Sequence, residues 1–362
     1  MRSRYSFWDV GSSEKGDKDS FEEFENYYHS NKRKFKSITI TDAVNLFQNW
    51  INDLSDRHFS VAITDPVTLK EYILSPRNKR IKNKESINYS TYQEDLKKFG
   101  FNLIENKTYN FNPKRPSHIL FGDFTSINRN KKILYLAFSN FYYEDNLKKT
   151  LEKYWLYLNE TQKVGGTIID LRNNLGGNPF FANILCYLFT GADKNIGGVQ
   201  DKPLGTIKFR TDVNPKAPKS PDQEIKIKSS LLNISQFSDL AKLTSLKNLY
   251  KTHNTPLVIL IDGNTASTAE YFSSALRQRN KVTLVGKNTL GQFSPPRALN
   301  PQTYEGGQFE LYGGGMKIKV IIANGVMEYK KCEIEGEGIF PDIYVDGNDA
   351  QIKKALEIIN KG

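Results

Sequence analysis

Residues 166–179 read GTIIDLRNNLGGNP, and this stretch decides the fold of the second half of the chain. The apolar run from Gly166 to Leu171 predicts a buried strand. Gly176-Gly177 predict a tight turn, and Asn178-Pro179 predict a helix with proline at its first position. At such a corner, backbone N–H groups can approach a ligand closely, which suits an oxyanion hole. A turn with a purely structural role has the same pattern.

A second corner of the same kind follows later in the chain. The apolar run from Leu257 to Ile261 predicts a strand, and a helix is expected from Ala266 to about Arg277. Ser267 would then lie in the first turn of the helix, where the positive end of the helix dipole favours negative charge. The N–H of Thr268 would point the same way. The alternative is that Thr265 or Ser267 only caps the helix.

Strands and helices alternate around these two corners, which predicts a layered α/β domain. Further strands are expected at residues 133–138 and 282–285, with a β-rich stretch over 309–323. Further helices are expected at residues 146–158 and 350–359.

The length of 362 residues exceeds one ordinary core, so more than one domain is expected. We expect a flexible tail over residues 1–18 and a helical region over 19–60. A small mixed or β-rich module is expected over 61–128, and the α/β domain over 129–362. Within the helical region, one helix is predicted to start at Ser20, and a second to run from about Asp42 to Leu54.

Composition is that of a globular protein, with 38% apolar and 25% charged residues. The net charge of +11 comes mainly from lysines that acidic neighbours interrupt, so we do not expect nucleic acid as a partner. Cys186 and Cys332 have no metal-ligand spacing and form no disulfide framework, and no other metal or cofactor is implied.

Nothing in the sequence predicts insertion in a membrane. No stretch reaches the ~18 apolar residues of a membrane helix, and residues 1–9 lack the apolar segment of a signal peptide. We therefore expect a cytoplasmic location, or an extracytoplasmic one in the cell envelope if a signal peptide has been removed.

Three ordered motifs resemble the tail-specific (carboxyl-terminal processing) and tricorn-core serine peptidases. The first corner resembles the pattern I-I-D-L-R-x-N-x-G-G of this family. The second resembles T-A-S-x-x-E, followed by V-G-x-x-T-x-G, which residues 285–291 match. Residues 335–345 resemble E-G-x-G-I-x-P-D-I-x-V. The resemblance implies a crotonase-like (ClpP-like) catalytic domain with Ser267 as nucleophile. It also implies an oxyanion hole formed by Gly176 or Gly177 together with Thr268.

The position of the general base differs from that in the lysine-dependent branch of this family. That branch has a lysine directly after the glycine of T-x-G. Gln292 occupies that position, and an amide cannot take the proton of a serine hydroxyl. The histidine-dependent branch is therefore the closer resemblance. His58, in a segment similar to D-G-H-[TS], is the candidate base, because an imidazole titrates near neutrality. The resemblance points to Glu335 as the orienting carboxylate, with Glu337 as the second choice, and Lys287 is the alternative base.

The expected function is hydrolysis of peptide bonds in a peptide or an unfolded protein. No glycine-rich carboxylate-binding loop of a PDZ module is visible before residue 130, so the substrate could add as a strand to a sheet edge. The alternative is a non-catalytic protein of the same fold that binds a peptide or a small ligand, which Gln292 favours. An acyl-CoA enzyme on the related fold lacks a recognisable nucleotide-binding feature. The sequence does not predict an oligomeric state.

Overall fold

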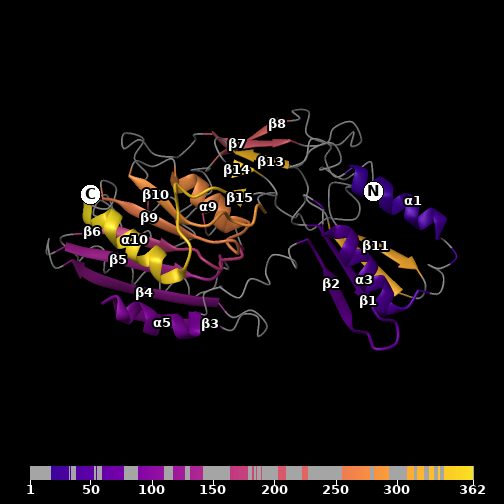
Figure 1. Cartoon of the computed structure of the whole chain (residues 1–362), viewed down its shortest axis with the longest axis horizontal. Helices are drawn as coiled ribbons and strands as arrows, with labels where there is room; N and C mark the ends of the chain where they lie inside the picture. The colour runs from indigo at the N-terminus through magenta and orange to yellow at the C-terminus, as the bar shows by residue number, and fades with distance from the viewer. Residues whose placement is uncertain are drawn as a thin grey trace, which may run out of the picture. The chain divides into compact units, whose positions relative to one another are not determined.

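The computed structural model divides the chain into two compact units, each built from separate stretches of sequence. The first unit comprises residues 1–83, 205–225 and 290–338, and the second comprises 84–204, 226–289 and 339–362. Figure 1 labels the elements of both units. The structure describes the following residues: 18–31, 33, 38–52, 54, 59–76, 89–109, 117–126, 131–141, 164–177, 182, 185, 189, 203–208, 222–226, 255–277, 281–292, 308–313, 316–321, 326–329, 333–334 and 338–361.

A seven-stranded mixed sheet forms the centre of the second unit. Its strands, in spatial order, are β16 (Ile343–Tyr344), β10 (Val282–Gly286), β9 (Leu257–Ile261), β6 (Val164–Asp170), β5 (Lys131–Phe138), β4 (Ser117–Ser126) and β3 (Asn102–Tyr109). The pairs from β16 to β5 are parallel, and β4 pairs antiparallel with both β5 and β3. All five side chains of β9 are buried, as expected for a central strand that is covered on both faces.

Helices cover both faces of this sheet. Helices α5 (Tyr89–Lys98) and α10 (Asn348–Lys361) share a core with Tyr135 and Ala137 of β5. Phe138 points to the other face, because side chains alternate along a strand, and there it meets Phe272 of helix α9 (Thr268–Arg277). Burial on both faces explains why β5 and β6 have continuous apolar runs, and the result is an α/β/α arrangement of layers (Figure 1).

The first unit contains a four-stranded antiparallel sheet. Its spatial order is β11 (Gln308–Gly313), β12 (Met316–Ile321), β1 (Ser60–Thr64) and β2 (Glu71–Leu74). Helix α3 (Ile40–Ile51) packs its apolar face on the core of this sheet, and Thr39 caps the helix by accepting the N–H of Asp42. Helix α1 (Lys18–Ser30) joins α3 through Phe24, whose ring stacks on Trp50 with centroids 4.2 Å apart.

Two smaller sheets complete the described secondary structure. One contains β13 (Val326–Tyr329), β7 (Pro203–Lys208) and β8 (Asp222–Lys226), and the other pairs β14 (Glu333–Ile334) with β15 (Gly338–Ile339). No helix among the described residues combines the length and the apolarity needed to cross a membrane.

The structure confirms the predicted strands and helices around the two corners. The four predicted strands are β5, β6, β9 and β10, and the predicted helices at 266–277 and 350–359 are α9 and α10. Helix α1 begins at Lys18, so Ser20 lies inside the helix and the predicted start was wrong by two residues. The helices predicted at 146–158 and from Asn178-Pro179 lie outside the described residues.

Residues 61–128, which we expected to form a small module, are distributed between the two large sheets. Strands β1 and β2 lie in the first unit, where β1 pairs with β12, whereas β3 and β4 extend the sheet of the second unit. The physical reason is that each of these strands completes a neighbouring sheet and satisfies its backbone hydrogen bonds there. The α/β class is confirmed as a mixed α/β fold, and the crotonase-like detail remains a prediction.

Candidate active site

The two sequence corners lie side by side at one edge of the large sheet. Strands β6 and β9 are parallel neighbours, with Asp170 opposite Leu260. Their carboxyl ends therefore lie at the same edge, and residues 171–177 and 262–267 follow directly from them. In open α/β sheets, ligands bind outside the carboxyl ends of the strands, so this edge is the expected position of a site.

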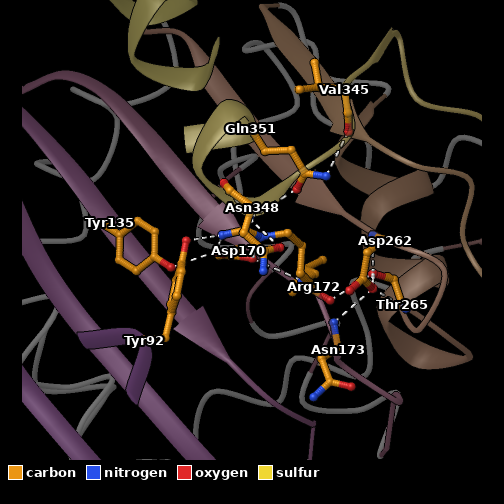
Figure 2. Close-up of polar contacts among 11 residues, drawn as sticks. Tyr92, Tyr135, Asp170, Arg172, Asn173, Asp262, Thr265, Val345, Asn348 and Gln351 are labelled. Carbon is orange, nitrogen blue, oxygen red and sulfur yellow. Dashed lines mark hydrogen bonds and ion pairs between the residues drawn. The ribbon is translucent and has the colours of Figure 1, made fainter. Parts of the chain in front are cut away.

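Backbone hydrogen bonds hold the two corners together. The N–H of Ala266 donates to the carbonyl of Asn174 at 2.9 Å, and the hydroxyl of Thr265 donates to the carbonyl of Leu171 at 2.9 Å. One carboxylate oxygen of Asp262 accepts the N–H of Asn173 at 2.9 Å and that of Thr265 at 2.9 Å, as Figure 2 shows. Burial raises the pKa of Asp262, and the backbone N–H groups of Asn173 and Asn264 oppose that rise.

The corners approach so closely that Gly176 has to be a glycine. A side chain there would place its Cβ 2.7 Å from the Cβ of Ser267 and 2.8 Å from the backbone nitrogen of Thr268, which is closer than real contacts allow. Gly176 also has a φ of 87°, in the left-handed region that glycine tolerates best. The structure therefore brings the predicted oxyanion corner into contact with the predicted nucleophile.

Ser267 precedes the first residue of α9 and has a left-handed backbone, with a φ of 55°. Its side chain is partly exposed, and Oγ makes no hydrogen bond to any residue that the structure describes. The hydroxyl of Thr265 is occupied with the Leu171 carbonyl and the Asp262 N–H. In the described part of the chain, neither hydroxyl therefore caps α9.

Backbone N–H groups next to Ser267 differ in their hydrogen bonds. The N–H of Gly176 donates to the side-chain oxygen of Asn174 at 2.9 Å. The N–H groups of Gly177 and Thr268 donate to no acceptor within the described residues. The hydroxyl of Thr268 donates to the carbonyl of Gly177 at 2.7 Å and so connects the two residues that carry these N–H groups.

The remaining sequence-predicted residues do not complete a described site. His58, Glu335 and Glu337 lie outside the described residues. Gln292 is 5% exposed and belongs to the first unit. Lys287, the alternative base, forms an ion pair with Asp346 at 2.6 Å.

His118 is the one histidine that the structure describes in the second unit. It lies at the start of β4, and burial lowers its pKa. Strands β5 and β6 separate β4 from β9, so three strand spacings amount to roughly 14 Å. His118 therefore lies on a strand that is not a neighbour of β9, from which the Ser267 corner starts.

Behind the first corner lies a buried polar cluster whose role the sequence did not reveal. Asp170 and Arg172 are both fully buried, and Arg172 Nε donates to Asp170 at 2.8 Å. The same guanidinium reaches the hydroxyl of Tyr92 in α5 and the backbone oxygen of Asn348 at the start of α10, the latter at 3.0 Å (Figure 2). Burial raises the pKa of Tyr92, so its hydroxyl stays neutral.

Comparison with models of known protein families identifies a family for this chain. The model of the family described as "Peptidase family S41" matches residues 132–345, which include both corners and the final motif. The chain belongs to peptidase family S41. The sequence-based assignment to these serine peptidases is therefore confirmed, and the choice of the histidine-dependent branch remains a prediction.

Solved structures resemble this chain to different degrees. A candidate peptidase from Parabacteroides merdae is 12% identical with a TM-score of 0.60, and the match covers 99% of this chain and 93% of that one. A lipoprotein from Streptococcus agalactiae is 14% identical with a TM-score of 0.46, covering 99% and 92%. The photosystem II D1 C-terminal processing protease is 17% identical with a TM-score of 0.35, covering 60% and 43%. No curated protein matches the chain.

Proposed function

We propose that this S41 peptidase hydrolyses peptide bonds through an acyl-enzyme on Ser267, with His58 as general base. One observation carries the proposal: Ser267, which is only partly buried, packs against the Gly176-Gly177 corner, and the N–H groups of Gly177 and Thr268 donate to no described acceptor. A serine that is accessible at a helix N-terminus, with two N–H donors beside it, is the arrangement that acyl transfer needs.

The reaction proceeds in two steps. His58 takes the hydroxyl proton while Oγ attacks the scissile carbonyl carbon, and the proton then passes to the amine as the C–N bond breaks. Water next attacks the ester carbonyl carbon and gives a proton to His58. The ester C–O bond then breaks, His58 returns that proton to Oγ, and the carboxylic acid product leaves. The N–H groups of Gly177 and Thr268 stabilise the oxyanion in both steps, because the N–H of Gly176 is already bonded to Asn174.

Several observations support His58 rather than another base. Gln292 stands at the lysine position, Lys287 is paired with Asp346, and His118 lies strands away from Ser267. Glu335 is the proposed carboxylate that orients His58, with Glu337 as the second choice. The proposed substrate is a peptide or an unfolded protein.

Substituting the nucleophile tests the proposal. Ser267→Ala should abolish hydrolysis of an unfolded protein, because no other hydroxyl takes its place, while Tm stays nearly unchanged. A fluorophosphonate probe should label the wild-type chain at Ser267 and leave the variant unlabelled. If Ser267→Ala retained turnover, the nucleophile would be another residue. A wild-type chain that binds peptides but shows neither labelling nor turnover would instead support the non-catalytic binding protein, which Gln292 favours.

A further inference from the structure

A buried carboxylate, that of Glu270, contacts the backbone of the nucleophile. Glu270 is fully buried in the first turn of α9, and its Oε2 accepts the N–H of Ser267 at 2.8 Å. The spacing from Ser267 to Glu270 is that of a capping box, in which the glutamate accepts the N–H of the capping serine and the serine oxygen accepts the N–H of the glutamate.

Only half of this capping box is formed. The N–H of Glu270 donates to the backbone carbonyl of Ser267 at 2.9 Å, and so does that of Tyr271 at 3.0 Å. The hydroxyl of Ser267 thus has no part in the box, whereas its N–H does. The left-handed backbone of Ser267 is unfavourable for a residue with a Cβ, so surrounding contacts must hold it.

The second oxygen of Glu270 is held as firmly as the first. Oε1 accepts the hydroxyl of Thr289 at 2.5 Å. The hydroxyl oxygen of Thr289 in turn accepts the N–H of Ile339 at 2.7 Å, so its single hydrogen is free to point at Glu270. The N–H of Thr289 also donates to the carbonyl of Ile339 at 3.1 Å. The carboxylate therefore acts only as an acceptor, and it cannot rotate without losing a donor.

We propose that Glu270, held by Thr289, is a positioning residue that keeps Ser267 in its reactive left-handed conformation. This inference rests on the proposed function of Ser267. It also links two of the three motifs, since Glu270 and Thr289 lie in the second motif and Ile339 in the third, and consecutive hydrogen bonds join them.

The test measures how fast a fluorophosphonate labels Ser267 in the full chain, together with kcat, KM and Tm. In Glu270→Gln, the amide keeps one acceptor and turns a donor toward the other partner. Labelling and kcat should therefore fall about tenfold to hundredfold, the scale of a displaced reacting group, with KM little changed. Thr289→Val removes the hydroxyl and should act in the same direction, whereas Thr289→Ser keeps it and should lose less.

Ser273→Ala is the matched control. It removes a buried hydroxyl in α9 that donates to the carbonyl of Ala269 at 2.8 Å and not to Glu270. It should lower Tm but keep the labelling rate within about twofold. If Thr289→Val is labelled as fast as Ser273→Ala, the positioning role is wrong while Ser267 stays the nucleophile. The comparison of Thr289→Val with Ser273→Ala tests the positioning role even if Glu270→Gln does not fold. An unlabelled wild-type chain would refute the nucleophile itself.

Discussion

Thr268 shows how one residue can serve a reaction through both its backbone and its side chain. Its N–H is one of the two proposed oxyanion donors, and its hydroxyl donates to the carbonyl of Gly177, the residue that carries the other. This bond ties the two strand-to-helix corners together, while the peptide unit that carries the Gly177 N–H is held by its own carbonyl, that of Gly176, which accepts the N–H of Phe141 at 2.9 Å. A donor that is already aimed before reaction needs no reorganisation in the transition state.

Removing the hydroxyl of Thr268 tests this link. In Thr268→Val, which keeps the shape of the side chain, we expect kcat to fall about tenfold, part of the loss expected for a whole oxyanion donor. KM should change little, because the contact matters when negative charge develops. Steady-state hydrolysis of a fluorogenic peptide measures both constants. Thr268→Ser keeps the hydroxyl and should lose less; equal losses in the two variants would refute the link.

At this scale, the sequence predicted residue types better than residue roles. The two glycines, Ser267 and Thr268 were all predicted at the site, and the structure brings them together. The sequence could not distinguish Gly176 from Gly177, because the distinction depends on the side-chain oxygen of Asn174, which bonds only one N–H. It also showed the spacing of Ser267 and Glu270, but not that the serine half of the capping box stays open.

Strand β6 connects the site to the helices on one face of the sheet. Arg172, which follows the strand, bonds the carboxylate of Asp170, the Tyr92 hydroxyl of α5, and Asn348 and Gln351 of α10 (Figure 2). A buried charge of this kind is tolerated only when it is paired and its hydrogen bonds are satisfied. The cluster therefore fixes the end of β6, from which the oxyanion corner starts.

Breaking the cluster should mainly affect stability. Arg172→Met leaves the carboxylate of Asp170 buried without its cation, and we expect the free energy of unfolding to fall by about 3–5 kcal/mol. Chemical denaturation measures this loss. The double variant Asp170→Asn/Arg172→Met removes both charges and should be less destabilised than the sum of the two single variants. Additive losses would show that the two residues do not act as a pair.

The strands and helices were predictable from the local sequence pattern, whereas the pairing of one strand with another was not. The apolar runs of β5, β6 and β9 identify them as central strands because both faces are buried. Nothing in the sequence of β1 indicates that its partner is β12, since pairing depends on which edges meet in three dimensions. Because strand pairing cannot be inferred from local sequence, residues 61–128 were expected to form one module.

At the scale of the whole molecule, each unit is built from segments that are far apart in the chain. The first unit combines the N-terminal region with residues 290–338, and the second combines residues 84–204 with two later segments. Contiguous boundaries inferred from sequence cannot describe such an arrangement. The peptidase motifs are scattered along the chain in the same way, at residues 168–177, 265–270, 285–291 and 335–345.

The general base gives the last prediction, since it decides the pH at which the whole enzyme works. A free imidazole titrates near pH 6.5 and is a base only when neutral, so kcat/KM should rise with pH through an apparent pKa of about 6–7.5. His58→Ala should remove nearly all of this activity. A peptide hydrolysis profile from about pH 5 to 10 measures both effects.

His118→Asn is the control for this profile. Because burial lowers the pKa of His118, dependence on that residue would move the rise below the ordinary imidazole range, whereas we expect the variant to keep the wild-type profile. A profile that rises only above about pH 8.5, with His58→Ala still active, would assign the base to a lysine such as Lys287. The ion pair of Lys287 with Asp346 argues against that result, because it stabilises the charged ammonium, which has no lone pair to accept the serine proton.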